Sequence, residues 1–156
     1  MDLVKKLDES SKYGQGFATV EYLAASLVDM DLHTLTEVPE DLDVIEFETR
    51  KLQERGIPRQ ILPRYRVTNF SHTMGGGYTA GYYSYLWSEV LDCDAFEAFK
   101  ETGDIFNSDL ALHYRKTCLE PGGIDSGLKM YINFRGRKPG IEALLRNRGL
   151  STAACR

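Results

Sequence analysis

The apolar and polar residues of this chain alternate mostly with a helical period. From Phe17 to Leu35 the apolar side chains recur at steps of three and four residues, which is the spacing of one face of an α-helix. Residues 41–56 repeat the pattern and end in Arg55 and Gly56, a basic last turn followed by a residue that commonly stops a helix. The pattern therefore predicts two helices in the first third of the chain.

The middle and the end of the chain add further helices around one irregular stretch. Residues 57–70 contain two prolines and an Arg-Tyr-Arg-Val alternation, so extended or irregular chain is expected there. The aromatic run at 77–103 is long enough for a helix of about six or seven turns. Shorter helical patterns follow at 106–120, 126–136 and 140–149. The predicted fold is mainly α, with at most a short strand pair near residues 60–80.

Composition limits the function classes. The 156 residues are the usual size of one domain, and a net charge of −4 offers no general attraction to nucleic acid. No apolar run has the length of a membrane span, so we expect no nucleic-acid or membrane partner. The three cysteines, Cys93, Cys118 and Cys155, show no paired spacing, which fits a reducing, cytoplasmic setting.

The aromatic run contains the first candidate chemistry. On a continuous helix Tyr78, Tyr82 and Tyr85 would fall within an arc of roughly 60°. Their hydroxyls could simply meet water or backbone at the edge of a core, or they could line a cleft and donate to a substrate carbonyl. The preceding glycines favour the cleft modestly, because glycine permits close backbone approach to a ligand. They are no phosphate loop, since no Gly-Lys-Ser/Thr follows.

The histidines suggest no metal site. His33 and His113 have no carboxylate or second histidine at ligand spacing, so we interpret both as ordinary hydrogen-bonded histidines. His72 stands six residues before Tyr78, where it could act as a further donor to the same site. No H-E-x-x-H is present, and we assign no metal ligand to this chain. The residues thus offer donors, but no evident nucleophile or base.

The run FSHTMGGGYTAGYYSYLWSEVLDCDAFEAFKETG resembles the C-terminal part of the catalytic domain of M3-family zinc metallopeptidases, the thimet oligopeptidase and peptidyl-dipeptidase group. The segments YGQGFATVEYLAASLVDMDLH, ILPRYRVTNFSH and GGIDSGLKMYINFRGRKPGIEALLRNRGL are similar to the corresponding family segments. The likeness therefore covers nearly the whole chain, and the peptidyl-dipeptidase (dipeptidyl carboxypeptidase) branch is nearest.

The resemblance implies a helical, zincin-like peptidase in which residues 1–156 are a C-terminal fragment of the catalytic domain. It implies zinc in the full-length parent, bound by an H-E-x-x-H helix and a later glutamate outside this chain. The implied partners are an oligopeptide substrate, with release of C-terminal dipeptides, and the missing N-terminal part of the same protease. Alone, the fragment is expected to be inactive.

The resemblance also implies roles for residues of this chain. It makes Tyr85, Tyr78 and His72 catalytic, with the two tyrosines as the principal donors to the oxyanion. Tyr82 and the glycine loop, Gly75, Gly76 and Gly77, are implied to bind substrate. A basic group near the end of the chain, Arg135, Arg137, Lys138, Arg146 and Arg148, could assist with a substrate carboxylate, but we interpret it as a solvated or domain-bridging surface. The alternative function is a non-catalytic helical module that binds peptides.

Overall fold

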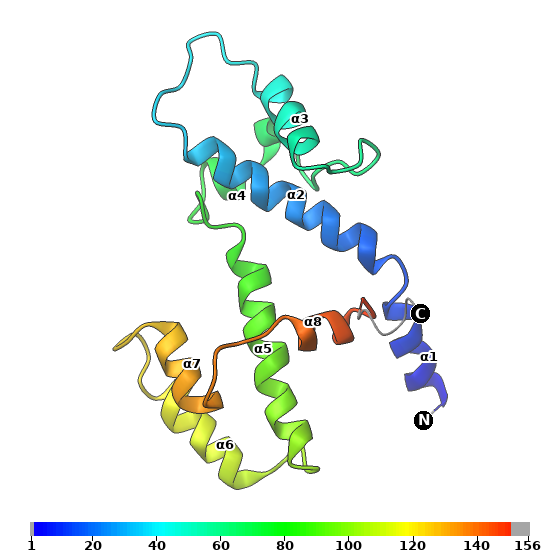
Figure 1. Cartoon of the computed structure of the whole chain (residues 1–156), viewed down its shortest axis with the longest axis vertical. Coiled ribbons are helices and arrows are strands. Elements are labelled where there is room, and N and C mark those ends of the chain that lie inside the picture. The colour runs from blue at the N-terminus through cyan, green and yellow to red at the C-terminus, as the bar shows by residue number, and fades with distance from the viewer. Residues whose placement is uncertain (1, 151–156) are drawn as a thin grey trace. The chain divides into compact units, whose positions relative to one another are not determined.

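The computed structural model describes residues 2–150, and their regular structure is helical. The chain divides into two compact units, residues 1–85 and 86–156. The elements labelled in Figure 1, with two short helical segments η1 and η2, are α1 (Asp2–Ser11), α2 (Gln15–His33), α3 (Val44–Glu54), η1 (Val67–Asn69), α4 (Ser71–Met74), α5 (Ser84–Glu101), α6 (Ser108–Tyr114), η2 (Arg115–Leu119), α7 (Gly127–Arg135) and α8 (Glu142–Asn147). The prediction of a mainly α fold is confirmed.

In the first unit α3 packs beside α2 (Figure 1). Helix α3 begins where the Asp43 carboxylate accepts the N–H groups of Ile45 and Glu46, both at 2.9 Å. It ends at Arg55, and Gly56 then adopts a left-handed conformation with φ 74°. The predicted glycine stop is therefore present.

The core of the first unit joins α2 to α3 and to the irregular stretch. One buried cluster contains Ala24, Val28, Leu52 and Val67. Glu48 on α3 is fully buried, and its carboxylate pairs with Arg66 and accepts the backbone N–H of Val67 at 3.0 Å. A buried charge is tolerated only with such partners, so Glu48 fixes the segment that leads into η1.

The second unit forms around α5 and α7. Ala95 and Ala98 of α5 pack against Tyr131 and Phe134 of α7. The buried Asp94 accepts the Tyr131 hydroxyl and pairs with Arg137 at 2.6 Å. Apolar packing and one buried polar cluster thus hold the same pair of helices together.

One expectation about the aromatic run needs correction. The aromatic run is not one helix from residue 78 onward, because residues 75–83 form turns and α5 begins only at Ser84. Ala80 has φ 53°, a left-handed conformation that cannot continue an α-helix. Residues 60–80, where the prediction allowed at most a short strand pair, hold η1, α4 and irregular chain.

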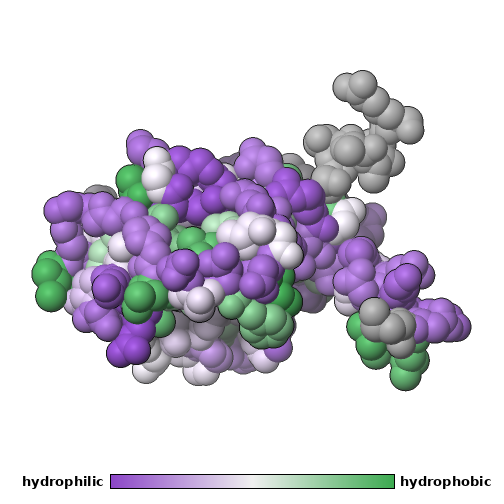
Figure 2. Space-filling view, turned by 90° about the horizontal axis from the view of Figure 1, so that it is seen from below, coloured by the Kyte–Doolittle hydropathy of each residue, from purple (hydrophilic) through white to green (hydrophobic). Residues whose placement is uncertain are grey.

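Apolar side chains also reach the surface. Figure 2 shows a largely hydrophilic surface on which hydrophobic residues are exposed in several separate places. On α1, which buries no residue, Leu3, Val4 and Leu7 are exposed. Trp87 and Phe96 on α5 are about half exposed. None of the helices between residues 2 and 150 is long and apolar enough to cross a membrane.

Candidate functional site

A pocket of about 320 Å³ in the first unit brings together two tyrosines of the aromatic run, Tyr82 and Tyr85, and an arginine. It is lined by residues from α2, the irregular stretch, α4, the turn and the first residues of α5, namely Tyr22, Arg64, Tyr65, His72, Tyr82 and Tyr85. Of the six, Arg64 carries the one permanent charge. Tyr65 lies beneath it, with the guanidinium carbon 5.6 Å from the ring centroid, a cation–π contact that helps to hold the charge.

The predicted donors form one aromatic cluster. The rings of Tyr78 and Tyr85 stack with centroids 5.0 Å apart, and Tyr82 meets Tyr85 edge to face at 5.6 Å. The centroid of the His72 ring lies 5.7 Å from that of Tyr78 and 6.1 Å from that of Tyr82. Tyr82 is buried, whereas Tyr78 and Tyr85 are exposed. The structure therefore places all four side chains next to one another, although not on one helix.

The glycines differ in how strongly the backbone requires them. A Cβ at Gly76 would lie 2.9 Å from the carbonyl oxygen of His72, which is too close for any side chain. A Cβ at Gly75 or Gly77 would make no contact under 3.8 Å. The tight approach at Gly76 lets the Tyr78 N–H donate to the same His72 carbonyl at 3.3 Å. Gly76 is therefore needed for the turn that places Tyr78 near His72.

Two phenols of the cluster, Tyr82 and Tyr85, are held in their neutral form. A hydrogen bond with the Tyr78 hydroxyl is the main cause that raises the pKa of Tyr85 to about 12. A shift in that direction means that Tyr85 keeps its proton at neutral pH. Burial raises the pKa of Tyr82, against the opposing effect of Arg64. Both groups are thus hydrogen-bond donors at neutral pH.

The sequence analysis missed the residues of α2 that hold this cluster. The Tyr22 ring stacks on Tyr82 at 4.9 Å, and its hydroxyl donates to the Tyr82 carbonyl. The buried Asp29 accepts the backbone N–H groups of Ala80 and Tyr82. Tyr22 and Asp29 are seven residues apart, which puts them on one face of α2. This spacing, together with two polar groups on an otherwise apolar face of α2, is the sequence signal that could have identified Tyr22 and Asp29.

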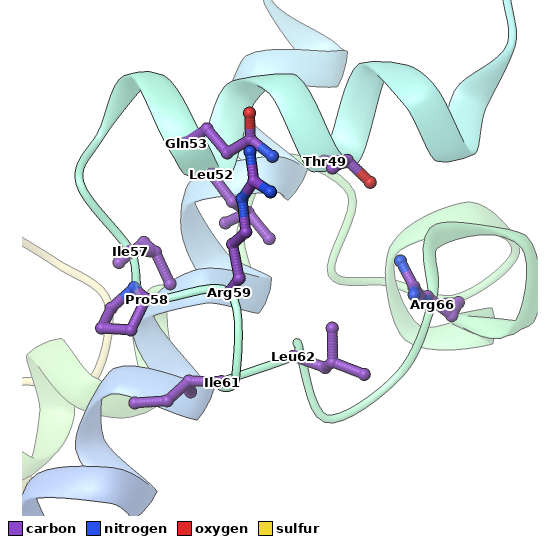
Figure 3. A pocket seen from close by; sticks show the side chains of 9 residues that line it. All are labelled: Thr49, Leu52, Gln53, Ile57, Pro58, Arg59, Ile61, Leu62 and Arg66. Carbon is purple, nitrogen blue, oxygen red and sulfur yellow. The ribbon is translucent and has the colours of Figure 1, made fainter.

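A second pocket, of about 260 Å³, contains none of the predicted residues. It lies beside α3, and Figure 3 shows its mostly apolar lining of Thr49, Leu52, Gln53, Ile57, Pro58, Arg59, Ile61, Leu62 and Arg66. Arg66 is already paired with the buried Glu48. This pocket offers less polar chemistry than the tyrosine pocket, so we do not place the site there.

The remaining candidate groups have other partners. His33 lies 2.9 Å from an Asp29 carboxylate oxygen, and His113 lies 3.3 Å from the carbonyl of Phe134, as expected of hydrogen-bonded histidines. The basic groups pair within the second unit, where Arg135 binds Glu101, Arg137 binds Asp94, Arg146 binds Glu97 and Arg148 binds Glu89. Cys93 and Cys118 are free thiols, and Cys155 lies outside the described residues.

The residues present do not fit a zinc ion. Within residues 2–150 no group of three or more histidine, cysteine, aspartate or glutamate side chains could hold a metal. A zinc site needs at least three such protein ligands.

Comparison with known proteins identifies the family. Residues 1–150 match the sequence model of Peptidase family M3. The chain belongs to peptidase family M3. Dipeptidyl carboxypeptidase of Escherichia coli is 37% identical over 152 residues, which are 96% of this chain and 22% of the relative.

Other M3 relatives show the same partial coverage. A probable cytosolic oligopeptidase A of Arabidopsis thaliana is 38% identical over 158 residues, 98% of this chain and 22% of the relative. Oligopeptidase A of Salmonella typhimurium is 33% identical over 151 residues, again 22% of the relative. The chain thus spans about a fifth of the length of these relatives.

Proposed function

We propose that this chain is the C-terminal part of the catalytic domain of an M3 zinc peptidase that hydrolyses oligopeptides. The observation that carries the proposal is the aromatic cluster of His72, Tyr78, Tyr82 and Tyr85, of which all but Tyr78 line one pocket, in a chain of this family. The zinc, whose chemistry is to activate water and polarise the scissile carbonyl, is bound by residues outside this chain.

The chain contributes neutral donors to the reaction. When water attacks a peptide bond, negative charge grows on the carbonyl oxygen, and preorganised donors stabilise that charge. Tyr78 and Tyr85, whose rings stack on each other, bring two phenol hydroxyls to that oxygen. His72 adds a further donor beside Tyr78, and the buried Tyr82 shapes the floor of the pocket.

Arg64 is the group that suits a peptide with a free C-terminus. A guanidinium pairs well with a carboxylate, and Arg64 brings that charge to a pocket otherwise lined by aromatic residues. The E. coli relative is named a dipeptidyl carboxypeptidase, which supports C-terminal dipeptide release as the finer activity. Arg64, rather than the internally paired basic groups of the second unit, is the carboxylate partner that we propose.

The rest of the peptidase is the partner that we propose for the exposed apolar faces. Helices α1 and α5 expose Leu3, Val4 and Trp87, which would lose contact with water in a larger protein. The chain is a fifth of its relatives in length, and that supports a larger protein. The cellular location stays a prediction, because one Arabidopsis relative is named cytosolic and another organellar.

A chimeric enzyme tests the proposal. The 152 matched residues of E. coli dipeptidyl carboxypeptidase would be exchanged for this chain, and cleavage of a quenched peptide would be measured with zinc present. We expect the chimera to cleave and the isolated chain to be inactive. Zinc-dependent turnover by the isolated chain would contradict the proposal, and peptide binding without cleavage by a correctly folded chimera would favour the non-catalytic binding module.

The role of Arg64 has its own test in the same chimera. Arg64→Gln should raise KM for a peptide with a free C-terminus by roughly ten-fold or more, because it removes a charged hydrogen bond to the carboxylate. The C-terminally amidated peptide should be affected much less. Arg59→Gln, beside the second pocket, is the matched control. An equal effect of Arg64→Gln on both peptides would count against carboxylate binding.

A further inference from the structure

The turn that carries Tyr78 and Tyr82 is held by one carboxylate from another helix. Asp29 lies on α2, and its side chain is fully buried. One carboxylate oxygen accepts the N–H of Ala80 and the other accepts the N–H of Tyr82, each at 3.1 Å. Asp29 therefore contacts the main chain on both sides of Gly81, within a segment that has no helical hydrogen-bond ladder.

The backbone of this turn needs that support. Ala80 has φ 53°, a left-handed conformation that costs an alanine roughly 1 kcal/mol or more. Tyr78 closes the turn by accepting the N–H of Gly81 at 2.8 Å. The bond from the Ala80 N–H to a buried, charged acceptor offsets the cost of this conformation, because a charge-assisted hydrogen bond is stronger than a neutral one.

Two further groups of α2 complete the arrangement. The His33 ring nitrogen lies 2.9 Å from one Asp29 carboxylate oxygen and 2.8 Å from the Asp29 carbonyl oxygen. His33 thus fixes the orientation of the carboxylate from the next turn of the helix. Tyr22 donates to the Tyr82 carbonyl. Both backbone groups of Tyr82 are therefore bound by α2.

We propose that Asp29 is the positioning residue of the tyrosine cluster, an inference that rests on the proposed function. Through the N–H groups of Ala80 and Tyr82 it sets the path of the backbone from Tyr78 to Tyr85. This path determines whether the Tyr78 and Tyr85 hydroxyls meet each other and face the substrate. Asp29 itself does not line the pocket and does not contact substrate.

The test is Asp29→Asn, which keeps the shape of the side chain. An asparagine has one acceptor oxygen, and its NH₂ group would face the second N–H, so one of the two bonds is replaced by a repulsive contact. In the chimera we expect kcat to fall about 10- to 100-fold with a much smaller change in KM, since misplaced donors affect mainly the transition state.

A spectroscopic readout separates positioning from general stability. In this 156-residue chain, tyrosine ring-carbon NMR should show the pKa of Tyr85 falling from about 12 toward 10.0 in Asp29→Asn, because its bond to Tyr78 is loosened. The matched control is Asp94→Asn in the second unit, which also alters a buried carboxylate but does not touch the turn. We expect the control to leave the Tyr85 pKa and kcat unchanged.

The outcomes are distinct. Unchanged kcat and unchanged Tyr85 pKa in Asp29→Asn would overturn the proposal, as would an equal loss of kcat in both variants with no change in pKa. If Asp29→Asn does not fold, His33→Gln should give a smaller change of kcat and pKa in the same direction, and no change there would overturn it. If Tyr85→Phe keeps full kcat while Asp29→Asn lowers the Tyr85 pKa, the oxyanion role fails but the positioning stands.

Discussion

At the scale of single residues, the protonation state of the phenols limits what the site can do. Tyr85 is exposed, yet its pKa is about 12 because it shares a hydrogen bond with Tyr78. Tyr85 therefore stays neutral at any pH below about 10, where it can donate but cannot act as a base. A loss of turnover between pH 7 and 9 would have to come from another group.

Tyr85→Phe tests the oxyanion role at this scale. The change removes one hydroxyl and keeps the ring that stacks on Tyr78. Loss of one oxyanion donor typically lowers kcat by about 10²–10³. We expect a fall of that order in the chimera, with zinc content unchanged, measured by peptide cleavage and metal analysis. Tyr83→Phe, at an exposed position of the same turn, is the control and should retain full kcat.

Tyr78→Phe tests the bond between the two phenols. Phenylalanine cannot accept a hydrogen bond, so the cause of the raised pKa of Tyr85 is removed. The pKa of Tyr85 should fall from about 12 toward 10.0, as measured by NMR titration. A value that stays near 12 would show that the bond to Tyr78 is not the cause.

The candidate residues could be named from the sequence, but their supports could not. The three tyrosines share a helical spacing, and the glycines mark a turn, so both signals are local. Asp29 lies 53 residues before Tyr82 in the sequence, and Arg64 lies 18 residues before it. Their approach to Tyr82 depends on how α2 packs, which no local pattern encodes.

At the scale of elements, the turn before α5 is the main departure from expectation. Spacing alone predicts that Tyr78 and Tyr82 continue the helix of Tyr85. Ala80 is instead held in a left-handed conformation by its bond to Asp29, a tertiary contact that overrides a local preference. The other helices were predictable because their apolar periods and stop signals are local, as at Gly56 after α3.

Gly76→Ala tests the close approach in this turn. Its Cβ would lie 2.9 Å from the His72 carbonyl oxygen, so the backbone must move. We expect a loss of about 1–3 kcal/mol in the free energy of unfolding, which is typical of overpacking. Urea denaturation would measure it. Gly77→Ala is the matched control, because a Cβ there meets nothing within 4 Å, and an equal loss in both variants would contradict the explanation.

At the scale of the whole molecule, both units contain buried carboxylates. Asp29 and Glu48 are buried in the first unit, and Asp94 is buried in the second. Burial by itself raises the pKa of Asp94. Hydrogen bonds with Arg137 and Tyr131 and the charges of Arg137 and Arg135 outweigh this effect, so the pKa is lowered from its ordinary value. The family could be inferred from the sequence because the likeness to its members extends through both units. The boundary between the units at residue 85 could not be predicted from that likeness.

Acid unfolding tests the Asp94 cluster. A carboxyl group with a lowered pKa stabilises the fold above its unfolded value, and this contribution is lost as the pH falls through the folded value. The chain should therefore lose stability below about pH 4, as measured by urea denaturation across pH. Asp94→Asn should cost about 3 kcal/mol at pH 7 and lack this acid-dependent part. Asp109→Asn, at an exposed position of α6, should behave like the parent chain.

The Asp29 carboxylate binds main-chain N–H groups, those of Ala80 and Tyr82, so these hydrogen bonds do not depend on the identity of a side chain. Every amino acid except proline offers that group. An exposed side chain of the turn, such as Tyr83, can therefore be exchanged while the backbone path is kept. Randomising that position in the chimera should therefore keep both the backbone path and the turnover.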